Sequence, residues 1–352
     1  MRLCFVVNSV RTQRPTYTTA HLAFSAFRRG HDVGFASVDA LSQGQGEDGE
    51  IRGELVRPRP GRTRDVAAYI KGLAGPRATR ETVRLNELDV VFLRNNPNAI
   101  KRDTAGEESF NPAIDFGRRL KRAGVMVIND PDGLTRAGSK MYLAGFPAEL
   151  RPKTLVTRSL ERVRSFLREL DGPAIIKPLT GFGGQNVFYL GRGQTANLAQ
   201  IISTVRRDGY VMVQEYLPAV TKGDKRVLLV GGNVCSVGGT VAAYRRMRPK
   251  DDIRSNMHVG GLRKRSDFTE AEALICELLR PRLVADGLYF VGVDLVGNKV
   301  LEINVFAPGG IHNINELYGV DVGTEVIRDL ERRVGLRAVY RDGLPPEVFM
   351  RA

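Results

Sequence analysis

The sequence lacks the long apolar runs of a membrane protein. None of its stretches approaches the ~18–20 consecutive apolar residues that a membrane span needs. The first apolar run, Leu3–Val7, is too short for the core of a signal peptide, and no small-residue cleavage site follows it. We therefore expect no membrane partner, and we interpret Leu3–Val7 as a first buried strand.

Cysteine and histidine are also scarce. The three cysteines, Cys4, Cys235 and Cys276, form no CxxC pair, so we expect buried free thiols and a reducing, cytoplasmic location. The four histidines show neither metal-ligand spacing nor HExxH, and GxSxG is absent. The sequence thus gives no support to a zinc enzyme or a serine hydrolase.

The charge is strongly of one sign, with a formal net charge of +14. The basic residues are scattered, and neither a basic low-complexity tail nor an aromatic RNA-binding motif accompanies them. A small anionic substrate needs only a local positive pocket. We therefore expect no nucleic-acid partner.

The pattern of apolar runs predicts an α/β protein. Strands and helices alternate over the first ~120 residues, as in a parallel α/β unit. The expected strands are Leu3–Val7, His31–Ala36, Leu88–Leu93 and Val125–Ile128, the helices are Ala20–Arg29 and Phe116–Ala123, and 40–65 is a loop or irregular hairpin.

The alternation repeats on a smaller scale over 154–216, and a β-rich region with glycine pairs starts near 226. Thr269 and Glu272 form the capping box of a later helix. Gly297-Asn298 lies between two apolar strands and is a strong hairpin signal.

A strand that ends in Lys177 leads into a glycine-rich loop, GFGG at 181–184. Such glycines let backbone N–H groups approach phosphate oxygens, and the lysine adds a positive charge. The pattern is neither a Walker A loop nor a Rossmann fingerprint. A flexible hairpin with an incidental lysine is the alternative.

The predicted hairpin around Gly297-Asn298 carries Asp294 on one strand and Glu302 and Asn304 on the other. Residues two apart share one face of a strand, and the hairpin brings Asp294 across from them. Three hard oxygen ligands suit Mg²⁺. A solvated edge hairpin is the alternative, but the apolar neighbours indicate a buried sheet.

The stretch Tyr244–Gly261 mixes basic residues, two acids and a glycine pair. It is typical of a mobile loop that closes over an anionic substrate. A disordered basic loop is the alternative.

In this order, these segments resemble bacterial glutathione synthetase, a member of the ATP-grasp superfamily. The resemblance covers nearly the whole chain and is strongest in IIKPLTGFGGQNVF, QEYLPAVTKGDKRVLLV and GLYFVGVDLVGNKVLEIN. It implies an ATP-grasp fold with an N-terminal α/β domain (1–124), a small central ATP lobe (125–217), a larger C-terminal α+β lobe (218–335) and a tail (336–352). It also implies an ATP-dependent carboxylate–amine ligase that forms an acyl phosphate and releases ADP, and we expect a homo-oligomer.

The resemblance assigns a role to each site residue, with ATP and Mg²⁺ (or Mn²⁺) as cofactors. The phosphate-binding lysines are Lys140 and Lys177, beside Gly181, Gly183 and Gly184; the adenine hinge is Gln214, Glu215, Tyr216 and Leu217, with Asp224 nearby; the metal ligands are Asp294, Glu302 and Asn304; and the residues around the reacting groups are Arg226, Arg246, Arg254 and Asn256.

Two departures from the family pattern stand out. Arg226 and Arg246 lie about five residues further apart than in the family, which predicts an extra turn around Asn233–Gly239. The segment Phe306–Gly310 lacks the hydroxyl side chains of the family, and its glycines could offer N–H groups to an anion. We therefore predict that γ-glutamylcysteine and glycine are a poor substrate pair.

Three functions stay open on the sequence. The first is a small-molecule peptide ligase of the glutathione-synthetase type. The second is a ligase that adds amino acids to a protein or peptide, as the related ribosomal-protein glutamate ligases do. The third is a non-catalytic ATP-binding regulator, against which the complete metal set counts.

Overall fold

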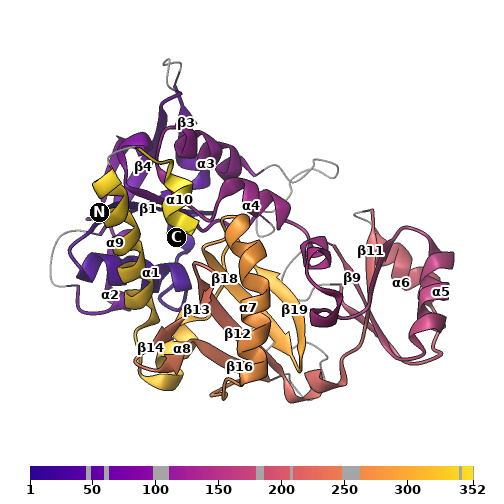
Figure 1. The fold of residues 1–352 in the computed structure, drawn as a ribbon. Coiled ribbons are helices and arrows are strands. Elements are labelled where there is room, and N and C mark those ends of the chain that lie inside the picture. The colour runs from indigo at the N-terminus through magenta and orange to yellow at the C-terminus, as the bar shows by residue number, and fades with distance from the viewer. Residues whose placement is uncertain are drawn as a thin grey trace.

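The computed structural model describes residues 1–44, 49–58, 63–97, 111–179, 186–206, 209–247, 262–340 and 343–351. In these ranges the strands form three larger sheets and one two-stranded sheet. Figure 1 shows the central lobe, residues 154–215, standing apart at one end, with the C-terminal sheet between it and the N-terminal domain.

The N-terminal sheet confirms the predicted parallel α/β unit. Its central strands β2 (Asp32–Ser37), β1 (Arg2–Val7), β6 (Val90–Leu93) and β7 (Met126–Ile128) are parallel. The predicted irregular hairpin is formed by β3 (Leu41–Gln43) and β4 (Ile51–Arg57). The sequence interpretation missed α2 (Val66–Ala74) and β5 (Thr79–Arg84), which pairs with β4.

Both faces of this sheet are buried, which explains the continuous apolar run in β1. Leu3 and Phe5 pack in one cluster with α1 (Thr18–Arg28) and α2. Cys4 and Val6 pack in the other cluster, with α3 (Pro112–Arg122) and α4 (Pro131–Arg136). All three cysteines are buried and free, as predicted, and burial raises the pKa of Cys4 to about 12.

The central lobe is a four-stranded antiparallel sheet in the order β10 (Phe188–Leu190), β9 (Ala174–Pro178), β11 (Val211–Glu215) and β8 (Thr154–Thr157). Helices α5 (Leu160–Leu170) and α6 (Leu198–Val205) contribute Val163 and Ile202 to its core. Ile176 and Val213 face that core, so Lys177 and Gln214 project from the opposite face.

The C-terminal lobe contains the largest antiparallel sheet. Its path is β17 (Leu262–Lys264), β16 (Ala243–Met247), β12 (Asp224–Val230), β18 (Phe290–Val296) and β19 (Lys299–Asn304), and β13 (Asn233–Val234) pairs with β12. The extra turn predicted around 233–239 is present as β13 and the hairpin of β14 (Ser236–Val237) and β15 (Thr240–Val241).

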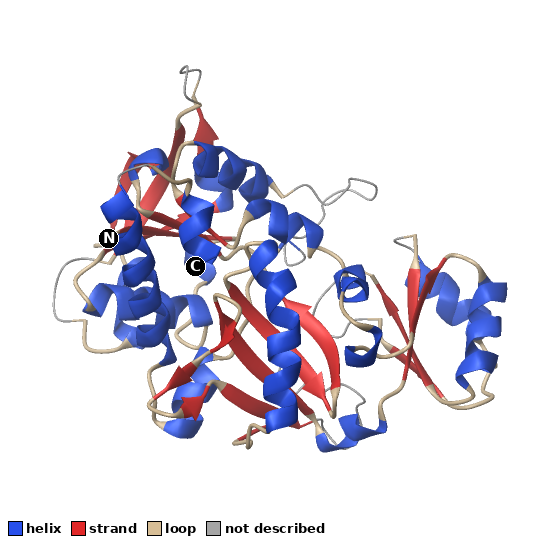
Figure 2. Cartoon of the chain, in the orientation of Figure 1, coloured by secondary structure: helices blue, strands red, loops and turns tan. Residues whose placement is uncertain are grey.

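Helix α7 (Glu270–Ala285) crosses one face of this sheet, as Figure 2 shows. It begins at the predicted Thr269–Glu272 capping box. Its Leu279 packs in one cluster with Val227 and Val293. Because side chains alternate along a strand, the neighbours Arg226 and Asp294 project from the other face.

The chain ends against its own N-terminal domain. Helix α8 (Ile311–Tyr318) leads into α9 (Val322–Tyr340), which packs on α1, and α10 (Pro346–Arg351) follows. Residues 336–352, expected as a tail, thus include the end of α9 and the buried Phe349. In the part of the chain that is described, no helix is long and apolar enough to cross a membrane.

Candidate active site

A cavity of about 950 Å³ lies where the three sheets approach one another. The central lobe contributes Lys177 and Gln214 to its lining. The large sheet contributes its charged face, and the N-terminal sheet contributes Asn8 and Arg94. The cavity therefore draws on distant parts of the sequence, as a site between lobes does.

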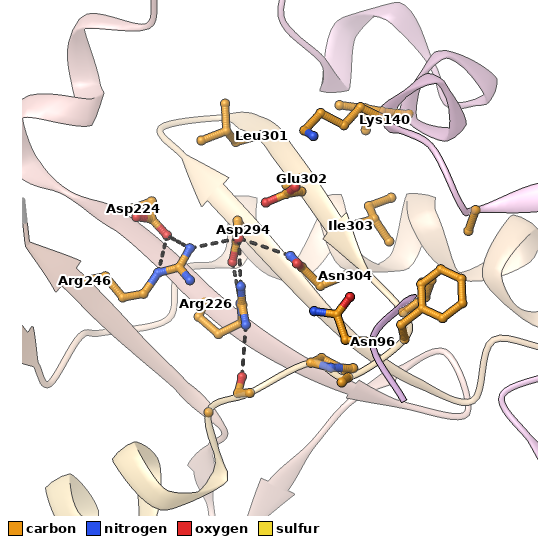
Figure 3. Close-up of a pocket in the computed structure, with 18 of the residues that line it drawn as sticks. Asn96, Lys140, Asp224, Arg226, Arg246, Asp294, Leu301, Glu302, Ile303 and Asn304 are labelled. Atoms are coloured by element: carbon orange, nitrogen blue, oxygen red, sulfur yellow. Dashed lines mark hydrogen bonds and ion pairs between the residues drawn. The ribbon is translucent and has the colours of Figure 1, made fainter. Parts of the chain in front are cut away.

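Five charged side chains of the large sheet gather on the face opposite α7 (Figure 3). Arg226 lies opposite Asp294, and Asp294 lies opposite Glu302. On the other side of β12, Asp224 lies opposite Arg246. The strand register thus brings together residues that are up to 78 positions apart in the sequence, from Asp224 to Glu302.

The buried acids of this face are paired with arginines. Arg226 donates from Nε and Nη2 to Asp294, with 2.9 Å from Nη2 to Oδ2. Arg246 Nη2 lies 2.8 Å from Asp294 Oδ2, and Nε donates to Asp224 over 2.8 Å. Burial alone would raise the pKa of Asp294, but the two arginines outweigh it and hold the pKa at about 2.

The predicted oxygen set meets across the β18–β19 hairpin. The amide of Asn304 donates to Asp294 over 3.2 Å, so its carbonyl oxygen is left for another partner. The carboxylate of Glu302 has no hydrogen bond or ion pair with another described residue, although Glu302 lines the cavity. Carboxylate and amide oxygens on adjacent strands fit a divalent metal ion, whereas no cluster of three His, Cys, Asp or Glu occurs within the described ranges.

The two predicted lysines line the other wall of the cavity. Lys177 Nζ donates to Gln214 Oε1 over 2.9 Å, and Gln214 is itself held by Thr154. Burial lowers the pKa of Lys177 to about 8 and also lowers that of Lys140, and Glu302 opposes both shifts. Because burial disfavours their charged forms, both lysines gain from an anionic ligand such as phosphate.

The predicted hinge runs from the end of β11 into the following loop. Gln214 is buried and oriented toward Lys177, while Glu215, Tyr216 and Leu217 line the cavity. Apolar side chains surround this part of the cavity: Ile175, Met212, Leu217, Val220, Leu301 and Ile303. A flat aromatic base fits such an apolar slot.

The segment Phe306–Gly310 uses its backbone polar groups internally. The carbonyls of Pro308 and Gly309 accept from Arg94 and Arg226, each over 3.0 Å. The Gly310 N–H donates to Thr18 Oγ1 over 3.1 Å. The prediction that both glycines offer N–H groups to an anion is therefore wrong for Gly310, because α1 provides its acceptor.

Sequence reasoning missed the part of the site that comes from the N-terminal domain. Asn8 follows β1 directly, and Arg94 follows β6. Ligands of open α/β sheets bind beyond the carboxyl ends of the parallel strands, so this rule could have found both residues. Gly292 was also missed: a Cβ there would lie 3.0 Å from Pro308 Cβ and 3.2 Å from Arg226 Cδ.

Five of the predicted site residues lie outside the described residues. They are Gly181, Gly183, Gly184, Arg254 and Asn256. Most of the predicted closing loop, Tyr244–Gly261, lies outside them too.

Two family models match consecutive parts of the chain. The model of the prokaryotic glutathione synthetase N-terminal domain matches residues 1–135, and the model of the ATP-grasp domain of prokaryotic glutathione synthetase matches 139–319. The chain belongs to this family. It is an ATP-dependent ligase with an ATP-grasp fold, which confirms the function and the fold expected from the resemblance, and it uses ATP and a divalent metal ion.

Two curated relatives match over almost their whole length. A glutathione synthetase of Gloeobacter violaceus is 35% identical over 93% of this chain and 95% of its own. One from Synechocystis sp. is 33% identical over 95% of this chain and 100% of its own. Glutathione synthetases act on small-molecule substrates, and this family membership gives no support to the protein-ligase or regulator alternatives.

Solved structures share the fold at low identity. D-cycloserine synthetase DcsG has a TM-score of 0.64 and 16% identity, covering 94% of this chain and 99% of its own. The macrocyclase MdnC of Microcystis aeruginosa, bound with its precursor peptide, has a TM-score of 0.60 and 14% identity, covering 94% of this chain and 100% of its own. These similarities support the fold alone.

Proposed function

We propose that this protein joins γ-glutamylcysteine to glycine with ATP and Mg²⁺, forming glutathione, ADP and phosphate. The observation that carries the proposal is the match to glutathione synthetases over almost the full length of both chains. The charged face of the large sheet supports it, because a cavity that combines lysines and arginines with carboxylate and amide oxygens suits phosphoryl transfer.

The reaction has two steps. The substrate carboxylate attacks the γ-phosphorus of ATP, and the bond from that phosphorus to the bridging oxygen breaks and leaves ADP. The glycine amine then attacks the acyl carbon of the acyl phosphate, loses a proton, and expels inorganic phosphate. The protein contributes mainly by positioning the reactants and neutralising charge.

We assign roles to the described residues from their surroundings. Lys140 and Lys177 bind phosphate oxygens, and Gln214 holds Lys177 in place. Glu215, Tyr216 and Leu217 bind the adenine, and Asp224 orients Arg246. The remaining roles, for Gly181, Gly183, Gly184, Arg254 and Asn256, are carried over from the family resemblance.

Asp294, Glu302 and Asn304 would hold the metal ion, which when bound offsets the negative charge of the phosphates. Arg226 and Arg246 lie beside Asp294, where they would contact the transferring phosphate. The four parts predicted from the sequence, 1–124, 125–217, 218–335 and 336–352, remain our proposed division of the chain. We also propose a cytoplasmic homo-oligomer without a nucleic-acid or membrane partner.

The cavity itself weakens the prediction of a poor substrate pair. Phe306–Gly310 has no side-chain hydroxyl, but Thr16, Thr18 and Thr19 line the same cavity from the N-terminal domain. Thr18 and Thr19 already accept from Gly310 and Arg94, so their hydroxyls are left to donate to a substrate, and Thr16 adds a further hydroxyl from the loop before α1. We therefore favour γ-glutamylcysteine and glycine over another pair.

The test is to incubate the purified protein with ATP, γ-glutamylcysteine and glycine, with Mg²⁺ or Mn²⁺, and to identify the products by mass spectrometry. We expect glutathione and ADP in equal amounts, with kcat/KM of ~10⁴ M⁻¹s⁻¹ or above. A much lower value would restore the prediction of another pair. Release of AMP and pyrophosphate would contradict the acyl-phosphate route.

A further inference from the structure

The acidic and basic side chains that line the cavity are unequally distributed. Its carboxylates, in the described part of the chain, lie on the hinge and on β12, β18 and β19: Glu215, Asp224, Asp294 and Glu302. The opposite end, formed by β17, α8 and the N-terminal domain, contributes Arg94 and Arg263. Neither has a carboxylate partner among the described residues.

Arg94 is not open to a ligand. Its Nε donates to Thr19 and its Nη2 to Pro308, and the remaining nitrogen, Nη1, is buried without a partner in the described structure. The guanidinium also lies over the rings of Phe92 and Phe290. Arg94 therefore holds the segment 306–310 against α1 rather than binding substrate.

Arg263 is half-buried, and its guanidinium, unlike that of Arg94, is bonded to a described residue at one nitrogen only. Its Nη1 donates to Asn313 Oδ1 over 2.7 Å, and Asn313 in turn donates to the hydroxyl of the buried Tyr244 over 3.0 Å. This fixes one corner of the guanidinium. The Nε–H and Nη2–H pair has no partner within the described ranges, and such a pair binds a carboxylate with two parallel hydrogen bonds.

The sheet register places Arg263 beside Arg246, which the proposed function puts next to the transferring phosphate. It lies opposite Arg246 across β16 and β17, so both side chains share the face that also carries Asp224. Adjacent strands are about 5 Å apart. Arg263 is thus one strand beyond Arg246, on the side away from Asp294 and Glu302.

The nearby histidines do not add to this positive charge near neutral pH. His312 lines the cavity, and burial followed by the charge of Arg263 lowers its pKa. The rings of His21 and His312 are 5.4 Å apart, and burial lowers the pKa of His21 as well. Among the described residues, Arg263 is therefore the accessible cation at this end of the cavity.

We propose that Arg263, held by Asn313, binds a substrate carboxylate that does not react. This rests on the proposed function, in which two such groups exist: the free α-carboxylate of γ-glutamylcysteine and the carboxylate of glycine. Both have the same chemistry, and the experiment below distinguishes them.

The test compares Arg263→Gln with Lys264→Gln, which removes the same charge from the exposed neighbour on the same strand. We expect Arg263→Gln to raise KM for one of the two substrates by about 10- to 100-fold, the range for losing a hydrogen bond to a charged group. KM for ATP should change less than twofold in both variants, and Arg263→Lys should recover part of the loss. The substrate whose KM rises identifies the carboxylate.

Carboxamide analogues add a readout that a structural role would not change. For the wild type, we expect the same rise in KM when the bound substrate is replaced by its amide, which is glycinamide or the α-carboxamide of γ-glutamylcysteine. Arg263→Gln should have equal KM values for the carboxylate and the carboxamide. Undiminished discrimination in Arg263→Gln, or an equal KM change in Lys264→Gln, would overturn the proposal. Asn313→Ala should raise the same KM by a smaller factor, because it frees the guanidinium to rotate.

Failure of the proposed function is a separate outcome. If the wild type forms no glutathione, ADP release with a panel of acids and amines identifies the pair that it does join. The same variants, and amide analogues of that pair, are then compared. A selective KM rise for a carboxylate-bearing substrate would still support the role of Arg263. Unchanged KM values there would refute it.

Discussion

The two faces of the large sheet differ in what they carry. One face, with Val227, Val293 and the α7 residue Leu279, is buried and apolar. The other face, with Arg226 and Asp294 on the same strands, lines the cavity. Because successive side chains of a strand point to opposite faces, neighbouring residues contribute to the apolar core and to the cavity in turn. Substitutions on the apolar face should therefore lower the free energy of unfolding, and substitutions on the charged face should mainly lower kcat.

Asp294→Asn and Glu302→Gln should have the largest effects on turnover. We expect each to lower kcat by about 10³-fold or more, because each replaces an anionic carboxylate beside the phosphates with a neutral amide. Asp294 is also buried with two arginines, so its replacement should lower the free energy of unfolding by about 3 kcal/mol. Glu302→Gln should leave it unchanged.

Steady-state kinetics and urea unfolding measure both quantities. Because two arginines pair with Asp294, we expect an intact fold of full stability only for Glu302→Gln. Equal unfolding free energies for the two variants would show that the ion pairs around Asp294 contribute little. Near-normal turnover of either variant at saturating Mg²⁺ would contradict the metal assignment.

Leu279→Ala tests the apolar face. Leu279 is fully buried under α7, so its truncation should lower the free energy of unfolding by about 2–5 kcal/mol. KM and kcat should stay within twofold at a temperature where the variant is folded. A large loss of kcat in the folded variant would break the separation between the two faces.

Gly292→Ala should disturb the charged face at its closest contact. The added methyl group would press on Pro308 and Arg226, and we expect a roughly tenfold lower kcat from the displaced arginine. Gly335→Ala is the matched control, because a Cβ there meets nothing within 4 Å. That helical substitution should raise the unfolding free energy by up to about 1 kcal/mol. A similar loss of kcat in both variants would refute the steric explanation.

The central lobe shows the same division in a second sheet, where Ile176 and Val213 face the core and Lys177 faces the cavity. Burial lowers the pKa of Lys177 to about 8 in the ligand-free protein, which gives a prediction for ATP binding. Bound phosphate raises that pKa, so ATP binding should take up a proton between pH 8 and about 10, and the affinity should fall up to about tenfold per pH unit above 8. Calorimetry in two buffers of different ionisation enthalpy measures this uptake. No uptake at pH 8.5–9 would mean that Lys177 is already charged.

Thr269→Ala should have the smallest effect. It removes the capping box of α7, which costs about 1 kcal/mol of unfolding free energy. The helix covers the apolar face, so kcat/KM should not change. Chemical unfolding and steady-state assays on one preparation decide this, and an altered kcat/KM would show that α7 transmits strain to the cavity.

Local patterns predicted the β18–β19 hairpin and the capping box, because both depend on residues close in sequence. Asp294, Glu302 and Asn304 meet as the alternation and the Gly297-Asn298 turn require. The partners of Asp294 could not be predicted in this way. Arg226 and Arg246 reach it through the pairing of β12 with β16 and β18, and strand order is a long-range property.

The missed elements have similar reasons. Helix α2 begins at Asp65, whose side chain caps it, but the preceding glycine- and arginine-rich stretch obscured its start. Asn313 is a polar residue on a short helix, and only its contacts with Arg263 and Tyr244 distinguish it. Sequence periodicity reports burial, whereas such contacts depend on where α8 packs.

The packing of α9 on α1 has a consequence for synthesis of the protein. Val326 and Leu330, near the end of the chain, share a core with Ala20 and Ala23, near its beginning. Figure 1 shows both termini on the same side of the molecule. While the ribosome still holds α9, the first domain lacks part of its interior and leaves apolar surface on α1 uncovered. The first domain to be translated is therefore completed only after α9 has been made.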